Sequence, residues 1–157
     1  MSQTDRLDRQ ADVTTARLTE RAILAWLTFT GLLLGVWATF FPRSFFEDFP
    51  GLGRVWVAVD GPWNEHLVRD VGQLSLALSV VSLAAVITMV PLLVRVAAAA
   101  WLVNAVPHLV YHLRHLENYD AFDQVGNVFS LSLLAILPAL VLVVSYRWPD
   151  TTNSRPA

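Results

Sequence analysis

Long uncharged stretches alternate with shorter charged ones along this chain, and their lengths predict membrane-spanning helices. Residues 22–41 carry no formal charge, and residues 73–113 carry one fixed charge, on Arg95. A helix rises about 1.5 Å per residue, so about 20 residues cross the hydrocarbon layer of a bilayer. The second stretch is about twice that length and must fold back on itself. Pro91 and Arg95 mark the turn, because proline disrupts a helix and arginine favours the headgroup region.

This pattern predicts an all-α fold, a four-helix transmembrane bundle in a single membrane domain over residues 22–147. The four spans are expected near residues 22–41, 67–89, 94–115 and 125–146. The first apolar stretch is too long for a cleaved signal peptide and ends in large residues instead of small ones. We therefore expect it to be retained as a span.

The segments outside the spans are more polar. Residues 1–21 mix charges of both signs. We expect a mobile start and then a short helix, capped by Thr14 or Thr15, that runs into the first span. Residues 42–65 are rich in proline, glycine and aromatic residues, which predicts a loop resting on the bilayer surface. A lid over a pocket is the alternative for this loop. Residues 148–157 form a polar tail.

Composition agrees with a small membrane protein. The 157 residues are 55% hydrophobic and 15% charged, and the mean hydropathy is +0.49. The net charge of −2 argues against a nucleic-acid partner and leaves the lipid bilayer as the expected surroundings. The chain has no cysteine, which excludes disulfides, thiolate metal sites and cysteine-held iron–sulfur clusters.

The distribution of arginine predicts the orientation in the cell membrane. Four spans place the N-terminus, the turn at Arg95 and the C-terminus on one side. That side has five acidic residues and seven arginines, at positions 6, 9, 17, 21, 95, 147 and 155. The other side has eight acidic residues and four arginines, at positions 43, 54, 69 and 114. The positive-inside rule then places both termini in the cytoplasm, and both long loops face outward.

A histidine stripe marks the outer end of the third span. His108, His112 and His115 are four and three residues apart, so they share one helix face. Two other spans begin outside with polar triads at the same spacing: His66, Asp70 and Gln73, and Asp123, Asn127 and Ser130. Unpaired polar groups are costly in lipid and should face the bundle interior. We expect an outward-opening pocket built from His66, Arg69, Asp70, Gln73, Asn104, His108, His112, His115, Asp123 and Asn127.

Several kinds of chemistry fit such a pocket. A transition metal would be held by His108, His112, His66 and Asp70. A haem would take His66 and one histidine of the third span, and histidine with aspartate suits proton or quinone chemistry. In the structural alternative, which we favour over metal or haem, Arg69 pairs with Asp70 or Asp123 and the network fixes the helix register. No nucleophile with its base, phosphate-binding glycine loop or dinucleotide motif is present, so catalysis is not predicted and the cofactor stays unknown.

Small residues and prolines bear on helix packing. Gly31 and Gly35 form a GxxxG motif in the first span, which allows close contact between helices. We expect this contact within the bundle, while a homo- or hetero-oligomer through the membrane helices stays open. Pro107 and Pro138 lie inside the third and fourth spans, where proline is expected to kink a helix.

Two sequence blocks carry a resemblance to small bacterial membrane proteins of uncharacterised function: Asn64-Glu-His-Leu-Val-Arg-Asp-Val-Gly72 and Pro107-His-Leu-Val-Tyr-His-Leu-Arg-His115. The plan of four spans with a tight second hairpin also resembles the DoxX-like membrane families. Some members are linked to quinone-coupled sulfur oxidation or membrane redox complexes, which implies a quinone-, haem- or metal-linked redox protein as the alternative function. No residue matches a catalytic position of that family. Our leading expectation is a non-enzymatic membrane component that is accessory or binds a small ligand.

Overall fold

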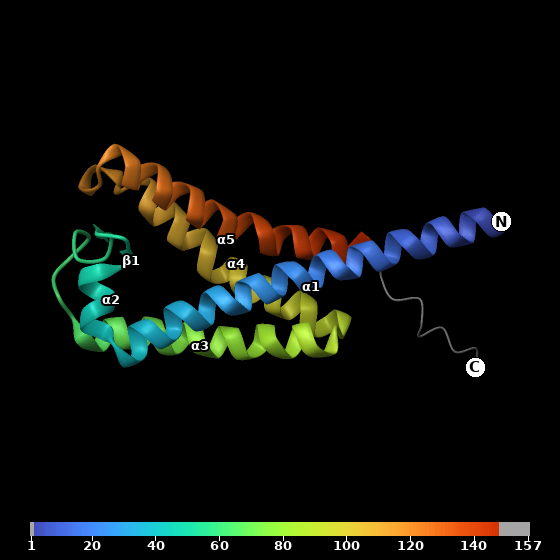
Figure 1. The fold of residues 1–157 in the computed structure, drawn as a ribbon, viewed down its shortest axis with the longest axis horizontal. Helices are drawn as coiled ribbons and strands as arrows, with labels where there is room; N and C mark the ends of the chain where they lie inside the picture. The colour runs from blue at the N-terminus through green and yellow to red at the C-terminus, as the bar shows by residue number, and fades with distance from the viewer. Residues whose placement is uncertain (1, 148–157) are drawn as a thin grey trace.

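The computed structural model describes residues 2–147, so the predicted polar tail lies outside the described residues. Four long helices make up most of the fold, and each is long and apolar enough to cross a membrane (Figure 1). They are α1 (Gln3–Phe40), α3 (Glu65–Thr88), α4 (Pro91–Leu113) and α5 (Ala121–Arg147). A short 3-10 helix, η1 (Leu116–Asn118), connects α4 to α5. The predicted all-α fold with four membrane-length helices is confirmed.

Helix α1 is longer than the predicted first span. The side chain of Ser2 accepts from the backbone N–H of Asp5, and the Asp5 carboxylate accepts from the Ser2 N–H, which is a capping box. Residues 3–21 contain no glycine or proline, so the helix continues without a break. The prediction that a helix starts at Thr14 or Thr15 and runs into the first span was right about its continuity and wrong about its start, because the helix begins at Gln3. Thr14 and Thr15 lie inside α1, where their hydroxyls donate to carbonyls one turn earlier.

The fold-back expected at Pro91 is present, whereas Arg95, which was expected to mark the turn with it, lies within α4. Asn64 is the N-cap of α3, and its side-chain oxygen accepts from the backbone N–H of Leu67 at 3.1 Å. Helix α3 ends at Thr88, and its C-cap Met89 adopts the left-handed conformation with φ of 49°. Pro91 then begins α4, where its missing N–H costs nothing. Pro107 and Pro138 lie inside α4 and α5, and each helix continues through its proline.

The segment between α1 and α3 is a folded cap, defined here as residues 42–64. A loop was predicted here, but residues Pro42–Asp48 form helix α2, so the prediction was wrong for that part. Strand β1 (Pro50–Gly51) then pairs antiparallel with β2 (Arg54–Val55). Aromatic side chains of the cap pack together and against the end of α1. Phe45 lies edge-on to Trp37 with ring centroids 5.7 Å apart, and Phe46 lies 5.1 Å from Trp63. These contacts fasten the cap to the α1–α3 side of the molecule.

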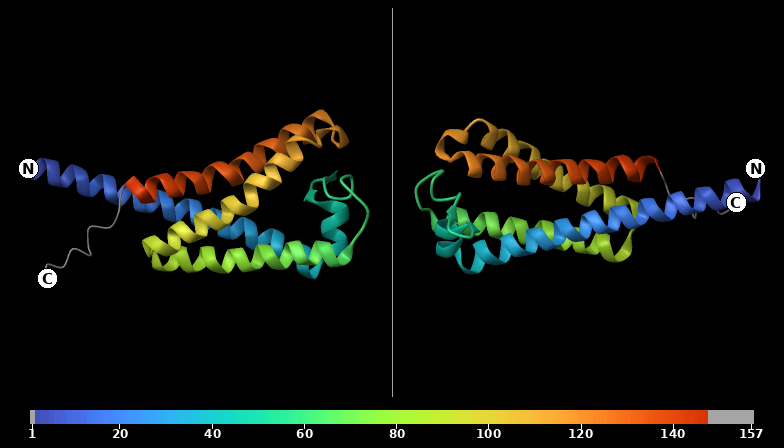
Figure 2. Two further views of the ribbon diagram at one scale, coloured as in Figure 1. Left: turned by 180° about the vertical axis from the view of Figure 1, so that it is seen from behind. Right: turned by 45° about the horizontal axis from the view of Figure 1, so that its top comes forward.

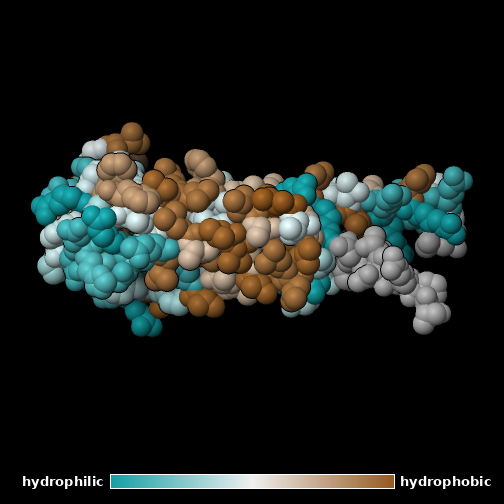
Figure 3. All heavy atoms as spheres, turned by 90° about the horizontal axis from the view of Figure 1, so that it is seen from below, coloured by the Kyte–Doolittle hydropathy of each residue, from teal (hydrophilic) through white to brown (hydrophobic). Residues whose placement is uncertain are grey.

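The helices pack as two pairs, α1 with α3 and α4 with α5. Figures 1 and 2 show the pairs crossing near the Met89 turn and diverging toward the cap. We call the end that holds the cap and η1 the loop end. The main core lies in the crossing region, where Leu24, Leu27, Val94 and Val141 are fully buried. Hydrophobic side chains cover the middle of the face drawn in Figure 3, between hydrophilic ends. This face therefore has the polarity that a membrane-spanning bundle requires.

Glycine residues set the close approach of α1 to α3. A Cβ atom at Gly35 would lie 2.8 Å from the side chain of Leu76, and one at Gly72 would lie 2.6 Å from the backbone nitrogen of Thr39. A Cβ at Gly31 would similarly meet Ser79. The use of the GxxxG motif within the bundle is confirmed.

Candidate functional site

Polar side chains are buried at the loop end, in the last turn of α4 and the first turns of α5. His112 and Asp123 are each 8% exposed, and Asn127 is 2% exposed. Tyr119, which follows η1, is 6% exposed. The rings of His112 and Tyr119 have centroids 6.2 Å apart, and Asp123 and Asn127 share one face of α5. Together with Trp56 of the cap, these residues are called the polar cluster.

Arg54 of β2 connects the cap to the start of α5. Its Nη1 and Nη2 atoms donate to the two carboxylate oxygens of Asp120 at 3.1 and 3.2 Å. Its Nε lies 3.0 Å from Oδ1 of Asp123, and its guanidinium lies 4.7 Å from the ring centroid of Phe122. Asp120 also accepts from the backbone N–H of Asp123, which lowers the pKa of Asp120, and the charge of Arg54 lowers it further. Both carboxylates are thus held by one guanidinium from the cap.

Trp56 and Tyr119 form a second connection between the cap and the helices. The Tyr119 hydroxyl donates to the backbone carbonyl of Trp56 at 3.0 Å. The Trp56 indole lies against Gly126, where a Cβ atom would be only 3.1 Å from the ring. Burial raises the pKa of Tyr119 to about 12, and the carboxylates of Asp60 and Asp123 add to the rise. The tyrosine therefore stays a neutral hydrogen-bond donor under the cap.

Four buried side-chain atoms of the polar cluster have no hydrogen-bond partner within the described part of the chain: Trp56 Nε1, His112 Nδ1, Asp123 Oδ1 and Asn127 Oδ1. The Asp123 oxygen has the ion pair with Arg54 described above, without the alignment of a hydrogen bond. A buried polar group left without a hydrogen bond costs about 1–3 kcal/mol. Four such atoms therefore lie near one another at the loop end of the described chain, one of them with an ion pair in place of a hydrogen bond.

The other residues of the histidine stripe lie outside the buried part of this cluster. His108 is exposed and its ring is edge-on to that of His112, with centroids 4.7 Å apart. The Nδ1 of His115 lies 2.8 Å from the Tyr111 carbonyl oxygen, and its ring stacks on that of Tyr111. Asn104 is exposed on α4. The histidines share a face as expected, but only His112 reaches the cluster.

The predicted site residues of α3 lie elsewhere. His66 Nε2 is 3.3 Å from Asp70 Oδ2 on an exposed face, and Gln73 is exposed as well. Arg69 pairs with Glu65 and donates to the Thr39 carbonyl. The structural alternative predicted that Arg69 pairs with Asp70 or Asp123, and that pairing is wrong. The start of α3 and the end of α4 lie on opposite sides of the cap in Figure 1. The cap occupies the space in which the three triads were expected to meet.

The expected metal ligands are not assembled. Within residues 2–147, no group of three or more His, Cys, Asp or Glu side chains is placed to hold a metal ion. His66 and Asp70 pair with each other on α3, away from His108 and His112 on α4. The cap itself contributes three residues that the sequence pattern did not single out, Arg54, Trp56 and Asp60. The sequence did offer one hint of the role of Arg54, since it is the only arginine between Arg43 and Arg69 and so the only cation of that segment that could pair with a carboxylate.

In comparisons with known proteins, the sequence matches no protein-family model and no curated protein, and the structure matches no solved structure.

Proposed function

We propose that this chain is a multi-pass protein of the cell membrane, with both termini in the cytoplasm, that binds a small ligand at the polar cluster. Four membrane-length apolar helices and the hydrophobic middle of the surface support membrane insertion. The excess of arginine at the end opposite the cap supports the orientation. The role is that of a binding or accessory component, because the cluster lacks a nucleophile paired with a base.

The unpartnered atoms of the polar cluster are the observation that carries this proposal. A buried network that only fixes helix register pairs its members, because each unpaired group costs stability. Here Asn127 Oδ1 is a buried acceptor with no donor, and Asp123 Oδ1, which pairs with Arg54, has lone pairs left to accept a further hydrogen bond. A ligand that donates hydrogen bonds serves these two acceptors.

Charge favours a cationic ligand. Around the cluster, Asp60, Asp120 and Asp123 contribute three negative charges against one positive charge from Arg54. The loop end as a whole has eight acidic residues against four arginines. A small primary ammonium supplies both the positive charge and the N–H donors that the acceptors need.

Asn127→Leu separates this proposal from the structural alternative. If the amide oxygen serves a ligand, the unliganded variant unfolds about 2–4 °C above the wild type, because an apolar group replaces an unpaired one. Methylammonium chloride raises the Tm of the detergent-purified wild type, relative to sodium chloride at equal ionic strength, and does not raise that of Asn127→Leu. Asn104→Leu, an exposed position on α4, is the matched control and keeps the response.

The opposite pattern overturns the proposal. A structural network predicts a lower Tm for Asn127→Leu and no methylammonium response in the wild type. Metal analysis and an absorption spectrum of the same preparation test the redox alternative that the DoxX-like resemblance implies. A stoichiometric metal or a haem band that disappears in His112→Ala would replace ligand binding with redox chemistry.

A further inference from the structure

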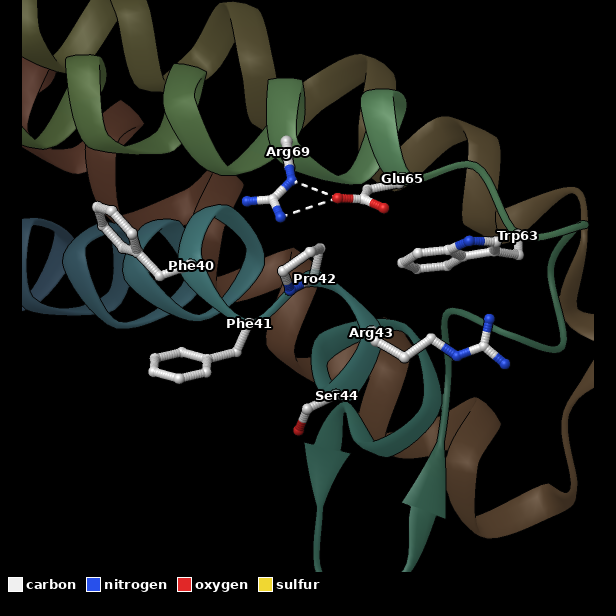
Figure 4. A pocket seen from close by; sticks show the side chains of 8 residues that line it. All are labelled: Phe40, Phe41, Pro42, Arg43, Ser44, Trp63, Glu65 and Arg69. Atoms are coloured by element: carbon white, nitrogen blue, oxygen red, sulfur yellow. Dashed lines mark hydrogen bonds and ion pairs between the residues drawn. The ribbon is translucent and has the colours of Figure 1, made fainter.

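An open depression of about 420 Å³ lies at the loop end, where α1 ends and α2 and α3 begin (Figure 4). Phe40 and Phe41 form its apolar side and are 62% and 63% exposed. Trp63 of the cap lines its other side. Phe40 is the last residue of a membrane-length helix, so the depression lies at the depth of lipid headgroups. An apolar wall beside a polar surface at this depth suits a phospholipid.

The polar surface of the depression contains charges of both signs. Arg69 and Glu65 project from α3 toward Pro42, and Glu65 Oε1 lies 2.8 Å from both Nε and Nη2 of Arg69 (Figure 4). Arg43 extends from α2 along Trp63, with its guanidinium carbon 4.9 Å from the ring centroid. Arg43 also pairs with Glu47. Each arginine therefore has a glutamate beside it, and the surface is close to neutral.

We propose that this depression binds the headgroup of a zwitterionic phospholipid with a primary ammonium, a phosphoethanolamine group. Its phosphate accepts hydrogen bonds from the guanidinium groups of Arg69 and Arg43. Its ammonium donates to the Glu65 carboxylate and lies against the Trp63 ring. Arg43 and Glu65 can exchange partners, because they are 61% and 54% exposed in their present ion pairs. Arg69 is 39% exposed and donates with Nη1 to the Thr39 carbonyl, so it offers the phosphate the nitrogen atoms that now face Glu65.

The same lining discriminates against other headgroups. A phosphoglycerol headgroup has no ammonium for Glu65 and brings a net negative charge to a surface that is already balanced. A phosphocholine headgroup carries a quaternary ammonium, which cannot donate a hydrogen bond to a carboxylate. This inference rests on the membrane insertion proposed above, and it is independent of the ligand proposed for the polar cluster.

Competition among lipids tests the assignment. The full chain in mild detergent is mixed with equal amounts of phosphatidylethanolamine, phosphatidylcholine and phosphatidylglycerol that have identical acyl chains, and bound lipid is counted by native mass spectrometry. We expect the wild type to retain about ten times as much phosphatidylethanolamine as either of the other two lipids, which corresponds to a difference of about 1.4 kcal/mol in binding free energy. Glu65→Gln shifts the preference to phosphatidylglycerol, because both arginines remain while the partner of the ammonium is lost.

Further variants keep the test independent of folding and of the polar cluster. Arg43→Gln lowers the retention of phosphatidylethanolamine and phosphatidylglycerol alike, since it removes a phosphate donor. Glu117→Gln, an exposed carboxylate of η1, is the control and keeps the wild-type preference. Asn127→Leu also keeps it, so the two proposals can fail separately. Equal retention of the three lipids by the wild type, or an unchanged preference in Glu65→Gln, would overturn the assignment.

Discussion

A few side chains decide how the cap is fastened to the helices. All three nitrogen atoms of the Arg54 guanidinium have carboxylate neighbours, two at Asp120 and one at Asp123. The planar group also lies against Phe122. A lysine at this position would present a single charged atom and could not contact both carboxylates in this geometry. The chain therefore uses one arginine to order the start of α5 and to close the polar cluster.

Tyr119→Phe should change how stability depends on pH. The ordinary tyrosine pKa is 10.0, and burial raises that of Tyr119 to about 12. The folded state holds this proton more tightly than the unfolded chain does. Its contribution to stability is therefore complete below pH 10 and is lost as the pH rises from about 10 to about 12. Unfolding measured between pH 8 and 12 should show this loss in the wild type and not in Tyr119→Phe.

The same comparison includes a control and a second effect. Tyr146→Phe, a 65% exposed tyrosine at the opposite end of α5, is the control for loss of a phenol outside the cap. Near neutral pH, Tyr119→Phe is less stable by about 1 kcal/mol, because the hydrogen bond to the Trp56 carbonyl is removed. Identical pH profiles for Tyr119→Phe and the wild type would show that this phenol is not held in its neutral form by the cap.

Some residues of the polar cluster can be predicted from the sequence as site residues, and others cannot. His112, Asp123 and Asn127 are predictable as a group, because helical periodicity places each on the polar face of its own span. Arg54 and Trp56 are not predictable in this way. Their contacts reach partners 66 and 63 residues away in the sequence, and spacing within one helix says nothing about such distant segments. Only the folded position of the cap determines which polar faces it covers.

Whole elements follow from the sequence where hydrophobic length is the dominant signal. The four membrane-length helices and the turn at Pro91 are predicted because lipid thickness and backbone chemistry leave few alternatives. Helix α2 and the part of α1 before Thr14 are missed. The start of α1 is exposed and is fixed by the Ser2 capping box. Helix α2 has no side-chain cap and instead buries Phe45 and Phe46 against its neighbours. Neither segment has the long apolar run that predicts a span.

Gly72→Ala tests the contact between α1 and α3. The new methyl group would lie 2.6 Å from the backbone nitrogen of Thr39 and 3.0 Å from the carbonyl carbon of Ala38. Backbone atoms cannot rotate away as side chains do, so the two helices must separate. We expect a loss of about 1–3 kcal/mol, measured as a Tm lower by several degrees in the same detergent.

A second glycine provides the control for this substitution. A Cβ atom added at Gly61 would face open space, with no other atom within 4 Å. Gly61→Ala should therefore change stability by less than about 0.5 kcal/mol. Equal effects of the two substitutions would mean that Gly72 acts through backbone flexibility and not through close packing.

At the scale of the whole molecule, the two ends have different chemistry. The loop end is acidic and holds the cap, whereas arginines at the opposite end tie helices together. Arg17 donates to the Met89 carbonyl at 3.2 Å, and Arg95 donates to Ser145 and lies against the Tyr146 ring. The spans alone do not predict that the two helix pairs diverge, because span lengths do not say which elements lie between the helix ends; Figure 1 shows the cap there. For that reason His66, Asp70 and Gln73 of α3 were predicted to line the pocket, whereas they lie apart from the polar cluster.

The absence of cysteine from the chain makes its orientation directly measurable. Leu52 lies at the tip of the β1–β2 hairpin and is fully exposed, and Gln10 is exposed on the part of α1 that extends beyond the bundle. With both termini in the cytoplasm, a membrane-impermeant maleimide labels Leu52→Cys in intact cells and labels Gln10→Cys only after permeabilisation. The reverse pattern would place the polar cluster on the cytoplasmic side. Val103→Cys, 76% exposed on α4, tests insertion itself, because a thiol within the hydrocarbon layer is out of reach of a charged reagent until detergent is added.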